Sequence, residues 1–210
     1  MYIHGMGGGS DSRIPSILRE CFDFSSSAIG QEVEVVCRTY DFDPEIAASQ
    51  ITSWVNEVRP DVIVAESLGS LHGLRIPNVP LVFVSPALNT SYYFEVLAWL
   101  SLIPGVTLIF DRIYRPREGD RQPLHFTFRI LRKYRAHRKL ALANKNHLGP
   151  VYAFFGTDDH YKKSGIVSIK TWKKHFGDTF SVYKGTHFME EEFVRSILYE
   201  KISCLLDTNK

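Results

Sequence analysis

Hydrophobic residues along this chain follow two alternating patterns. Short runs rich in apolar or β-branched residues, typical of strands, occur at 2–4, 32–38, 61–65, 79–84, 151–155 and 178–183. The runs at 61–65 and 79–84 are almost fully apolar, as expected in the centre of a parallel sheet. Between the runs, apolar residues recur every three or four positions, as they do on the buried face of a helix. Strands that alternate with helices in this way form right-handed βαβ units. The sequence therefore predicts an α/β fold built on a doubly wound, mainly parallel sheet.

Local signals mark several of the predicted helices. One helix begins at Asp43-Pro44, an N-cap followed by a proline at the first helical position. A longer helix is expected at about 162–175, behind the run at 151–155. The last helix presents one apolar face, formed by Val194, Ile197, Leu198, Ile202 and Leu205.

Residues 89–148 interrupt the alternation. Sixty residues separate two strands that need only a single crossover, so we interpret this segment as an insertion, predicted to form a helical lid. It begins with aromatic residues and ends in a strongly basic helix at about 126–143. The chain as a whole, 1–210, is expected to form one domain with the lid inserted in it.

Composition narrows the class of protein. With 44% hydrophobic and 23% charged residues, the chain has the make-up of a globular protein with a real core. Its N-terminus lacks a signal-peptide pattern, and no apolar stretch is long enough to span a bilayer. We therefore expect a cytoplasmic protein without a membrane partner. An odd number of cysteines without close spacing predicts buried free thiols in a reducing compartment, at Cys21, Cys37 and Cys204.

The strongest chemical signal directly follows the run at 61–65. The chain there reads Ala65-Glu66-Ser67-Leu68-Gly69, a G-x-S-x-G nucleophile elbow with alanine at the first glycine position. The turn is so tight that only small residues fit at its two flanks. It holds the Ser67 hydroxyl clear of the backbone and directs the Leu68 N–H into the same space as an oxyanion donor. The alternative is that Ser67 only caps the next helix.

A glycine-rich segment lies between the first run and the first helix, and it reads His4-Gly5-Met6-Gly7-Gly8-Gly9. In a doubly wound sheet this loop lies beside the elbow, so the Met6 N–H is a second candidate oxyanion donor, with Gly7 as its substitute. A phosphate-binding loop is the competing interpretation. However, no Lys-Ser/Thr pair follows the glycines, and no acidic residue ends a second strand. A nucleotide site is therefore not expected.

Two later strand ends supply an acid and a base. The run at 151–155 leads into Asp158 and Asp159, and the run at 178–183 leads into His187. The carboxyl ends of parallel strands share the ligand-binding edge of a sheet, where an aspartate can orient a histidine base. On position alone both aspartates are candidates, and His160 is the rival of His187.

The motifs HGMGGG, AESLG, GTDD and GTH, in this order, resemble those of the α/β-hydrolase superfamily, specifically its small single-domain serine esterases. The resemblance covers nearly the whole chain except the insertion. It implies a site made of a nucleophile, an acid, a base and two backbone oxyanion donors, which are Ser67, Asp159, His187, Met6 and Leu68.

In that family the acid is the third residue after the glycine, which favours Asp159 over Asp158. The chain departs from the family pattern at Ala65, where glycine is usual. It also begins at the strand that leads into His4, so two strands that precede it in larger members are absent. A start further upstream remains open.

The resemblance implies hydrolysis of an ester or thioester through an acyl-enzyme intermediate, with a small-molecule acyl substrate and with no metal or organic cofactor. A peptidase or an acyltransferase would use the same residues. A non-catalytic binding protein of this fold is the remaining alternative.

The insertion concentrates positive charge. Eleven of the 25 Lys and Arg residues lie between Arg112 and Lys145. One interpretation is a solvated helix face. The other is that Arg132, Arg135 and Lys139 place positive potential at the mouth of the site and favour anionic substrates. Nucleic-acid binding is not expected, because only Tyr134 is interleaved to stack on bases.

Overall fold

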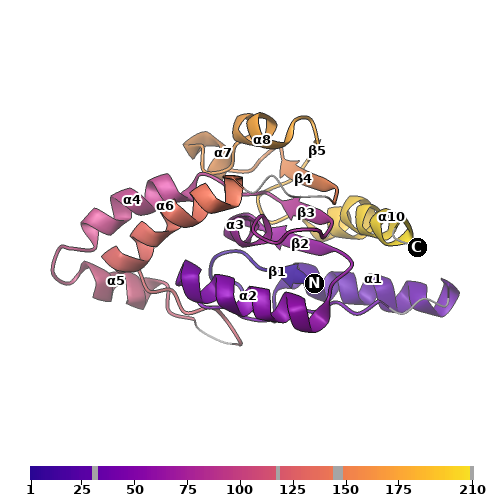
Figure 1. The fold of residues 1–210 in the computed structure, drawn as a ribbon, viewed down its shortest axis with the longest axis horizontal. Helices are drawn as coiled ribbons and strands as arrows, with labels where there is room; N and C mark the ends of the chain where they lie inside the picture. The colour runs from indigo at the N-terminus through magenta and orange to yellow at the C-terminus, as the bar shows by residue number, and fades with distance from the viewer. Residues whose placement is uncertain (30–32, 117–118, 144–148, 209–210) are drawn as a thin grey trace.

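Five parallel strands form a single sheet, in the order β1 to β5, in the computed structural model (Figure 1). It describes residues 1–29, 33–116, 119–143 and 149–208. The strands are β1 (Tyr2–Ile3), β2 (Ile63–Glu66), β3 (Leu81–Val84), β4 (Val151–Gly156) and β5 (Phe180–Tyr183). The helices are α1 (Arg13–Ile29), α2 (Pro44–Val58), α3 (Ser70–Gly73), α4 (Thr90–Leu100), α5 (Val106–Ile113), α6 (Phe128–Ala143), α7 (Tyr161–Ser164), α8 (Ile169–Phe176), α9 (Glu191–Phe193) and α10 (Tyr199–Thr208). A 3₁₀ turn (Ser67–Gly69) precedes α3, and a π-helical turn (Val194–Leu198) joins α9 to α10.

Both faces of the sheet are buried, as a doubly wound sheet requires. Successive residues of each strand point to opposite faces, so Ile63 and Ala65 of β2 pack in one core while Val64 packs in the other. The first core also takes residues of α2, α3 and α8, and the second takes residues of α1 and α10. The predicted α/β architecture with a parallel sheet is confirmed.

Three local predictions are wrong. The run at 32–38, whose residue 32 lies outside the described part, forms only an isolated parallel bridge from Cys37 to Tyr2. The reason is that β1, its neighbour, is two residues long and offers few backbone groups to pair. The helix expected at 162–175 is divided into α7 and α8, because Gly165 ends α7 with a φ of 78°. Of the three cysteines predicted to be buried, Cys37 is buried, Cys21 is half-buried and Cys204 is exposed.

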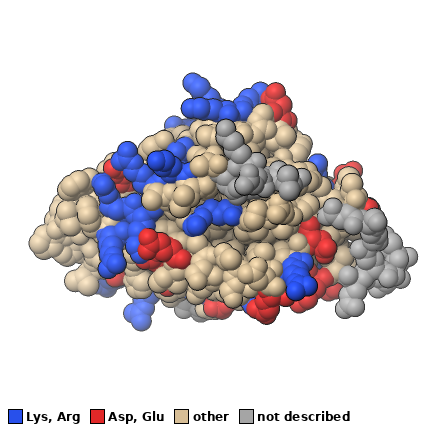
Figure 2. Space-filling view, in the orientation of Figure 1, with Lys and Arg blue, Asp and Glu red and all other residues tan. Residues whose placement is uncertain are grey.

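Residues 89–148, of which 117–118 and 144–148 lie outside the described part, carry α4, α5 and α6. These helices gather at one end of the molecule, beside the sheet (Figure 1), and Lys and Arg side chains cluster over that end (Figure 2). Helix α6 is joined to the segment before α2 by Lys133, which contacts Asp43 at 2.6 Å, and to α4 by Arg135, which contacts Glu95 at 2.8 Å.

Among all the helices in the described ranges of the chain, none is long and apolar enough to cross a membrane.

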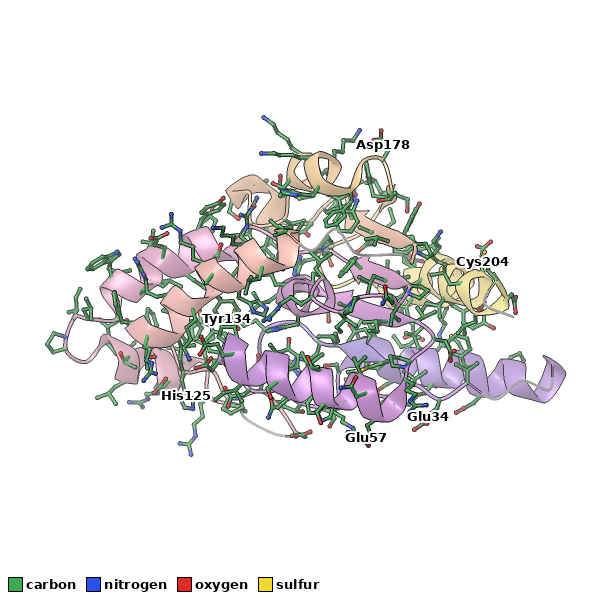
Figure 3. All side chains as sticks on the ribbon, in the orientation of Figure 1. Glu34, Glu57, His125, Tyr134, Asp178 and Cys204 are labelled. Carbon is green, nitrogen blue, oxygen red and sulfur yellow. The ribbon has the colours of Figure 1, made fainter. Side chains whose placement is uncertain are left out.

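A buried histidine cluster lies where α6 meets α2 and α3. Tyr134 of α6 points toward α2 (Figure 3) and donates to the Phe42 carbonyl at 2.8 Å. Beside it, the His137 ring lies 4.5 Å from that of His72, and His4 stacks on Tyr40 at 4.1 Å. Burial lowers the pKa of His4 and that of His137 to about 4. Burial also lowers the pKa of His72 well below its usual value.

These histidines predict acid-sensitive stability. The pKa values of these histidines in the folded protein lie below the value of 6.5 for an accessible imidazole. Between about pH 6.5 and about pH 4 the unfolded chain therefore binds more protons than the folded chain does. We expect the free energy of unfolding to fall in that window by roughly 1 kcal/mol per pH unit and per histidine. Urea unfolding at a series of pH values measures this slope.

Two variants separate the buried histidines from other titrating groups. His72→Leu should flatten the slope, whereas the exposed control His125→Gln should leave it unchanged. Equal slopes for the wild type and for His72→Leu would contradict the assignment.

Candidate active site

The chain turns sharply where β2 ends. Ser67 has a φ of 49°, in the left-handed region that non-glycine residues rarely adopt. Gly69 packs against the β1–α1 loop so closely that a Cβ there would overlap the carbonyl oxygen of His4. The methyl group of Ala65 is accommodated because Gly73 faces it, where a Cβ would lie 3.1 Å away. The sequence argument for small residues at both flanks of the elbow therefore agrees with the packing.

Ser67, His187 and Asp159 form one hydrogen-bonded chain. His187 Nε2 lies 2.9 Å from Ser67 Oγ, and His187 Nδ1 lies 2.8 Å from Asp159 Oδ2. His187 and Asp159 are each only 2% exposed, so their contact is shielded from water. The three predicted residues, contributed by three different strand ends, are thus brought together with the geometry of a nucleophile, a base and an orienting acid.

The environment of Asp159 favours a carboxylate. Burial alone would raise its pKa, but the hydrogen bond and charge of His187 outweigh burial and lower the pKa below its usual value. The Tyr161 N–H adds a hydrogen bond to Asp159 Oδ1 at 2.9 Å. Asp158, the other sequence candidate, is exposed. His160, the rival base, is also exposed, and its ring lies 6.2 Å from that of His187.

The loop that carries His187 is anchored on both sides. The Asp158 N–H donates to the Gly185 carbonyl at 2.9 Å. On the other side the guanidinium of Arg13 donates to the carbonyl oxygens of Phe188 and Met189. These contacts fix the position of the imidazole, because they hold the backbone before and after it.

The glycine-rich loop is held by the insertion. Gln122, which is buried, accepts from the Gly7 N–H at 3.1 Å, and its own N–H donates to the Gly8 carbonyl at 2.7 Å. Gly9 pairs with Arg121 in an isolated antiparallel bridge. Because the Gly7 N–H is bound by Gln122, it is not available as the substitute oxyanion donor. The Met6 and Leu68 residues both line the same cavity as Ser67.

Sequence reasoning missed Gln122 and Tyr40. The Gln122 side-chain amide donates to the Tyr40 carbonyl at 3.1 Å, and the Tyr40 hydroxyl donates to the His4 carbonyl at 2.6 Å. Together they hold the glycine-rich loop in place. No local pattern marks either residue, because both act across long separations in the chain.

A carboxyl group, Glu66, lies next to the serine. It accepts from the Tyr2 hydroxyl at 2.8 Å. Burial raises the pKa of Glu66, against the opposing effects of the Tyr2 hydrogen bond and the His187 charge. The described residues contain no group of three or more His, Cys, Asp or Glu side chains that could hold a metal ion.

The serine opens into a cavity of about 510 Å³. Apart from Ser67, His187 and the glycine-rich loop, its walls are mainly aromatic and aliphatic, formed by Leu68, Ala87, Tyr93, Phe94, Leu97, Tyr114, Phe126, Tyr161, Ile166 and Phe188. The basic side chains among the described lining residues are Arg13 and Arg121, and neither belongs to α6. The cavity therefore fits an apolar group placed beside the serine.

Solved structures of similar fold include several hydrolases. A monoacylglycerol lipase from Paleococcus ferrophilus superimposes with a TM-score of 0.60 at 16% identity, over 98% of this chain and 93% of that one. E-2-(acetamidomethylene)succinate hydrolase gives a TM-score of 0.54 at 16% identity, over 98% and 90%. The chain has the α/β-hydrolase fold.

A metagenome-derived lipolytic enzyme shares the α/β-hydrolase fold with a TM-score of 0.56 at 13% identity, over 98% of this chain and 92% of that one. No protein-family model matches the chain, and no curated protein matches it in sequence. At such low identity the likeness concerns the fold, and the chemistry has to be argued from the site itself.

Proposed function

We propose that this protein is a serine hydrolase that cleaves an ester or thioester with an apolar acyl group. The observation that carries the proposal is the hydrogen-bonded chain from Ser67 through His187 to Asp159, on a strained elbow that opens into an apolar cavity. A serine alone is a weak nucleophile, and it becomes a strong one when an oriented histidine accepts its proton.

The mechanism follows from this arrangement. His187 Nε2 takes the Ser67 proton while Oγ attacks the acyl carbon, and the oxyanion is bound by the N–H groups of Met6 and Leu68. His187 then gives the proton to the leaving group, and the acyl group remains on Ser67. Water, deprotonated by the same histidine, attacks the acyl-enzyme and releases the acid. Asp159 remains ionised and stabilises the imidazolium.

The insertion serves as a lid in this proposal, since Tyr93, Phe94, Leu97 and Tyr114 form walls of the cavity. An anionic substrate has less support. Of the three α6 side chains expected to attract one, Arg132 and Arg135 are paired with Glu95. Neither they nor Lys139 belong to the described lining of the cavity. A peptidase or an acyltransferase would differ in the leaving group or in the acceptor, not in these residues.

Replacement of the nucleophile tests the proposal. Ser67→Ala should fold normally and lose roughly 10⁴-fold or more in kcat toward a p-nitrophenyl ester, because only oxyanion and binding contributions remain. Steady-state kinetics and circular dichroism of the purified variant measure both effects. Hydrolysis at the wild-type rate would overturn the proposed chemistry.

The two adjacent aspartates provide a matched pair. Asp159→Asn should lower kcat by around 10⁴-fold, since the amide favours the wrong tautomer of the histidine. Asp158→Asn should change kcat little, because that side chain is exposed. The same ester assay compares the two variants, and a larger loss in Asp158→Asn would reassign the acid.

Replacement of Gln122 should lower kcat selectively, because this residue supports the loop that binds the transition state. Gln122→Met keeps the volume but removes the bonds to Gly7 and to the Tyr40 carbonyl, so the oxyanion loop can shift. A shift of about 1 Å costs up to roughly 10²-fold in rate, so kcat should fall while KM stays nearly unchanged. A rise in KM at constant kcat would mean that Gln122 shapes substrate binding instead.

A further inference from the structure

Helices α4 and α5 of the insertion carry an exposed apolar surface, which we call the apolar tip. It consists of eight large side chains on α4, on α5 and on the turn between them, namely Val96, Trp99, Leu100, Leu102, Ile103, Leu108, Ile109 and Ile113. Each is more than 40% exposed, with Leu108 at 74%. Single exposed apolar residues are ordinary on protein surfaces, but a contiguous group of this size marks an interaction site.

Helix α5 exposes apolar side chains that a surface helix normally buries. It is strongly amphipathic in sequence, yet none of its residues is buried. A surface helix normally turns such a face to the core. Phe110 anchors the helix to the first core and packs on Phe126 at 5.5 Å. Leu108, Ile109 and Ile113, by contrast, are more than half exposed, so much of the apolar surface of α5 faces solvent.

Positive charge borders the apolar tip. Arg112 follows Leu108 by one turn on the exposed side of α5, and Arg115 lies just beyond the helix. On the α6 side, Trp99 packs on Phe128 at 5.3 Å, and the Arg132 guanidinium lies over the same Phe128 ring at 5.8 Å. Figure 2 shows Lys and Arg side chains next to the uncharged end of the molecule.

Of the acidic groups near the apolar tip, Glu95 is paired with Arg132 and Arg135. Asp111 lies 3.8 Å from His125, and its Oδ1 has no hydrogen-bond partner among the described residues, so its charge offsets part of that of the neighbouring arginines. The exposed Arg112 and Arg115 outnumber Asp111, so the border of the tip keeps a positive character.

We infer that the apolar tip docks on a bilayer surface that contains anionic phospholipids. Apolar side chains would enter the boundary between headgroups and acyl chains, while the arginines pair with lipid phosphates, as interfacial helices do without spanning a membrane. A second copy of the chain fits less well, since a two-fold contact would bring the same positive border against itself.

Docking in this way would also place the cavity near the lipid. Leu97 of α4 lines the cavity, while Val96 and Trp99 of the same helix belong to the apolar tip. The sequence analysis predicted no membrane partner, because the apolar stretches around 95–110 are too interrupted to span a bilayer. Surface binding needs only that they share one side of the molecule, and it requires no hydrolysis.

Trp99 is a built-in reporter for the test. It is 58% exposed, whereas Trp172 is fully buried and Trp54, on α2, is half-buried beneath the Arg38 guanidinium. Contact of the tip with lipid should therefore shift the emission of Trp99 to the blue. The full chain is titrated with vesicles of phosphatidylcholine alone and with vesicles that also contain phosphatidylglycerol, and bound protein is measured by sedimentation. We expect a blue shift and co-sedimentation with the mixed vesicles. Trp99→Phe should lose the shift but not the sedimentation.

Surface variants separate the apolar and the electrostatic contributions to vesicle binding. Leu108→Ser with Ile109→Ser should weaken the partition coefficient at least tenfold, while Ile46→Ser, an exposed site on α2, should not change it. Arg112→Gln with Arg115→Gln should weaken binding to mixed vesicles by roughly 25-fold, at about fivefold per arginine.

Two outcomes would overturn the inference. One is the absence of binding to mixed vesicles. The other is self-association in sedimentation velocity that Leu108→Ser with Ile109→Ser abolishes, which would make a second copy the occupant of the tip. The binding assay is repeated with Ser67→Ala, so that loss of hydrolysis and loss of docking are observed separately.

Discussion

The contact between the elbow and the β1–α1 loop is the constraint on which the rest of the site depends. Gly69 touches the carbonyl of His4 where no side chain fits, and Gly5 lies so close to Ser67 that a Cβ there would be 3.1 Å from the serine Cβ. This approach brings two backbone segments, far apart in sequence, next to one hydroxyl. Only with both in place can N–H groups of each face the same oxyanion.

The insertion does more than form walls of the cavity, because it also holds the backbone beside the active site. Gln122 binds the glycine-rich loop and the segment after Thr39, and Tyr134 binds the Phe42 carbonyl. The same sixty-residue segment thus supports the loop beside the serine, forms walls of the cavity and carries the apolar tip.

The sequence was sufficient for the features that depend on short stretches. Ser67, Asp159 and His187 each follow a strand, and parallel strands bring such positions to one edge whatever their spacing along the chain. The helix cap at Asp43 and the alternation of strands and helices are equally local, and both are present in the structure.

What the sequence could not supply depends on distant partners. Whether 33–38 becomes a strand is decided by the length of β1, and Ala65 is tolerated because residue 73 happens to lack a side chain. Gln122 shows the same limit, since its partners lie more than eighty residues away. In sequence, α5 has the pattern of an ordinary amphipathic helix, and only the structure shows that none of its residues is fully buried.

The most direct measurement is reaction with a fluorophosphonate, which forms a covalent bond only with an activated serine, followed by mass spectrometry of the labelled peptide. The account predicts stoichiometric labelling of Ser67 in the wild type and loss of labelling in His187→Ala, where the serine remains but no base accepts its proton. Labelling of a different serine, or no labelling of folded wild-type protein, would contradict the proposed active site.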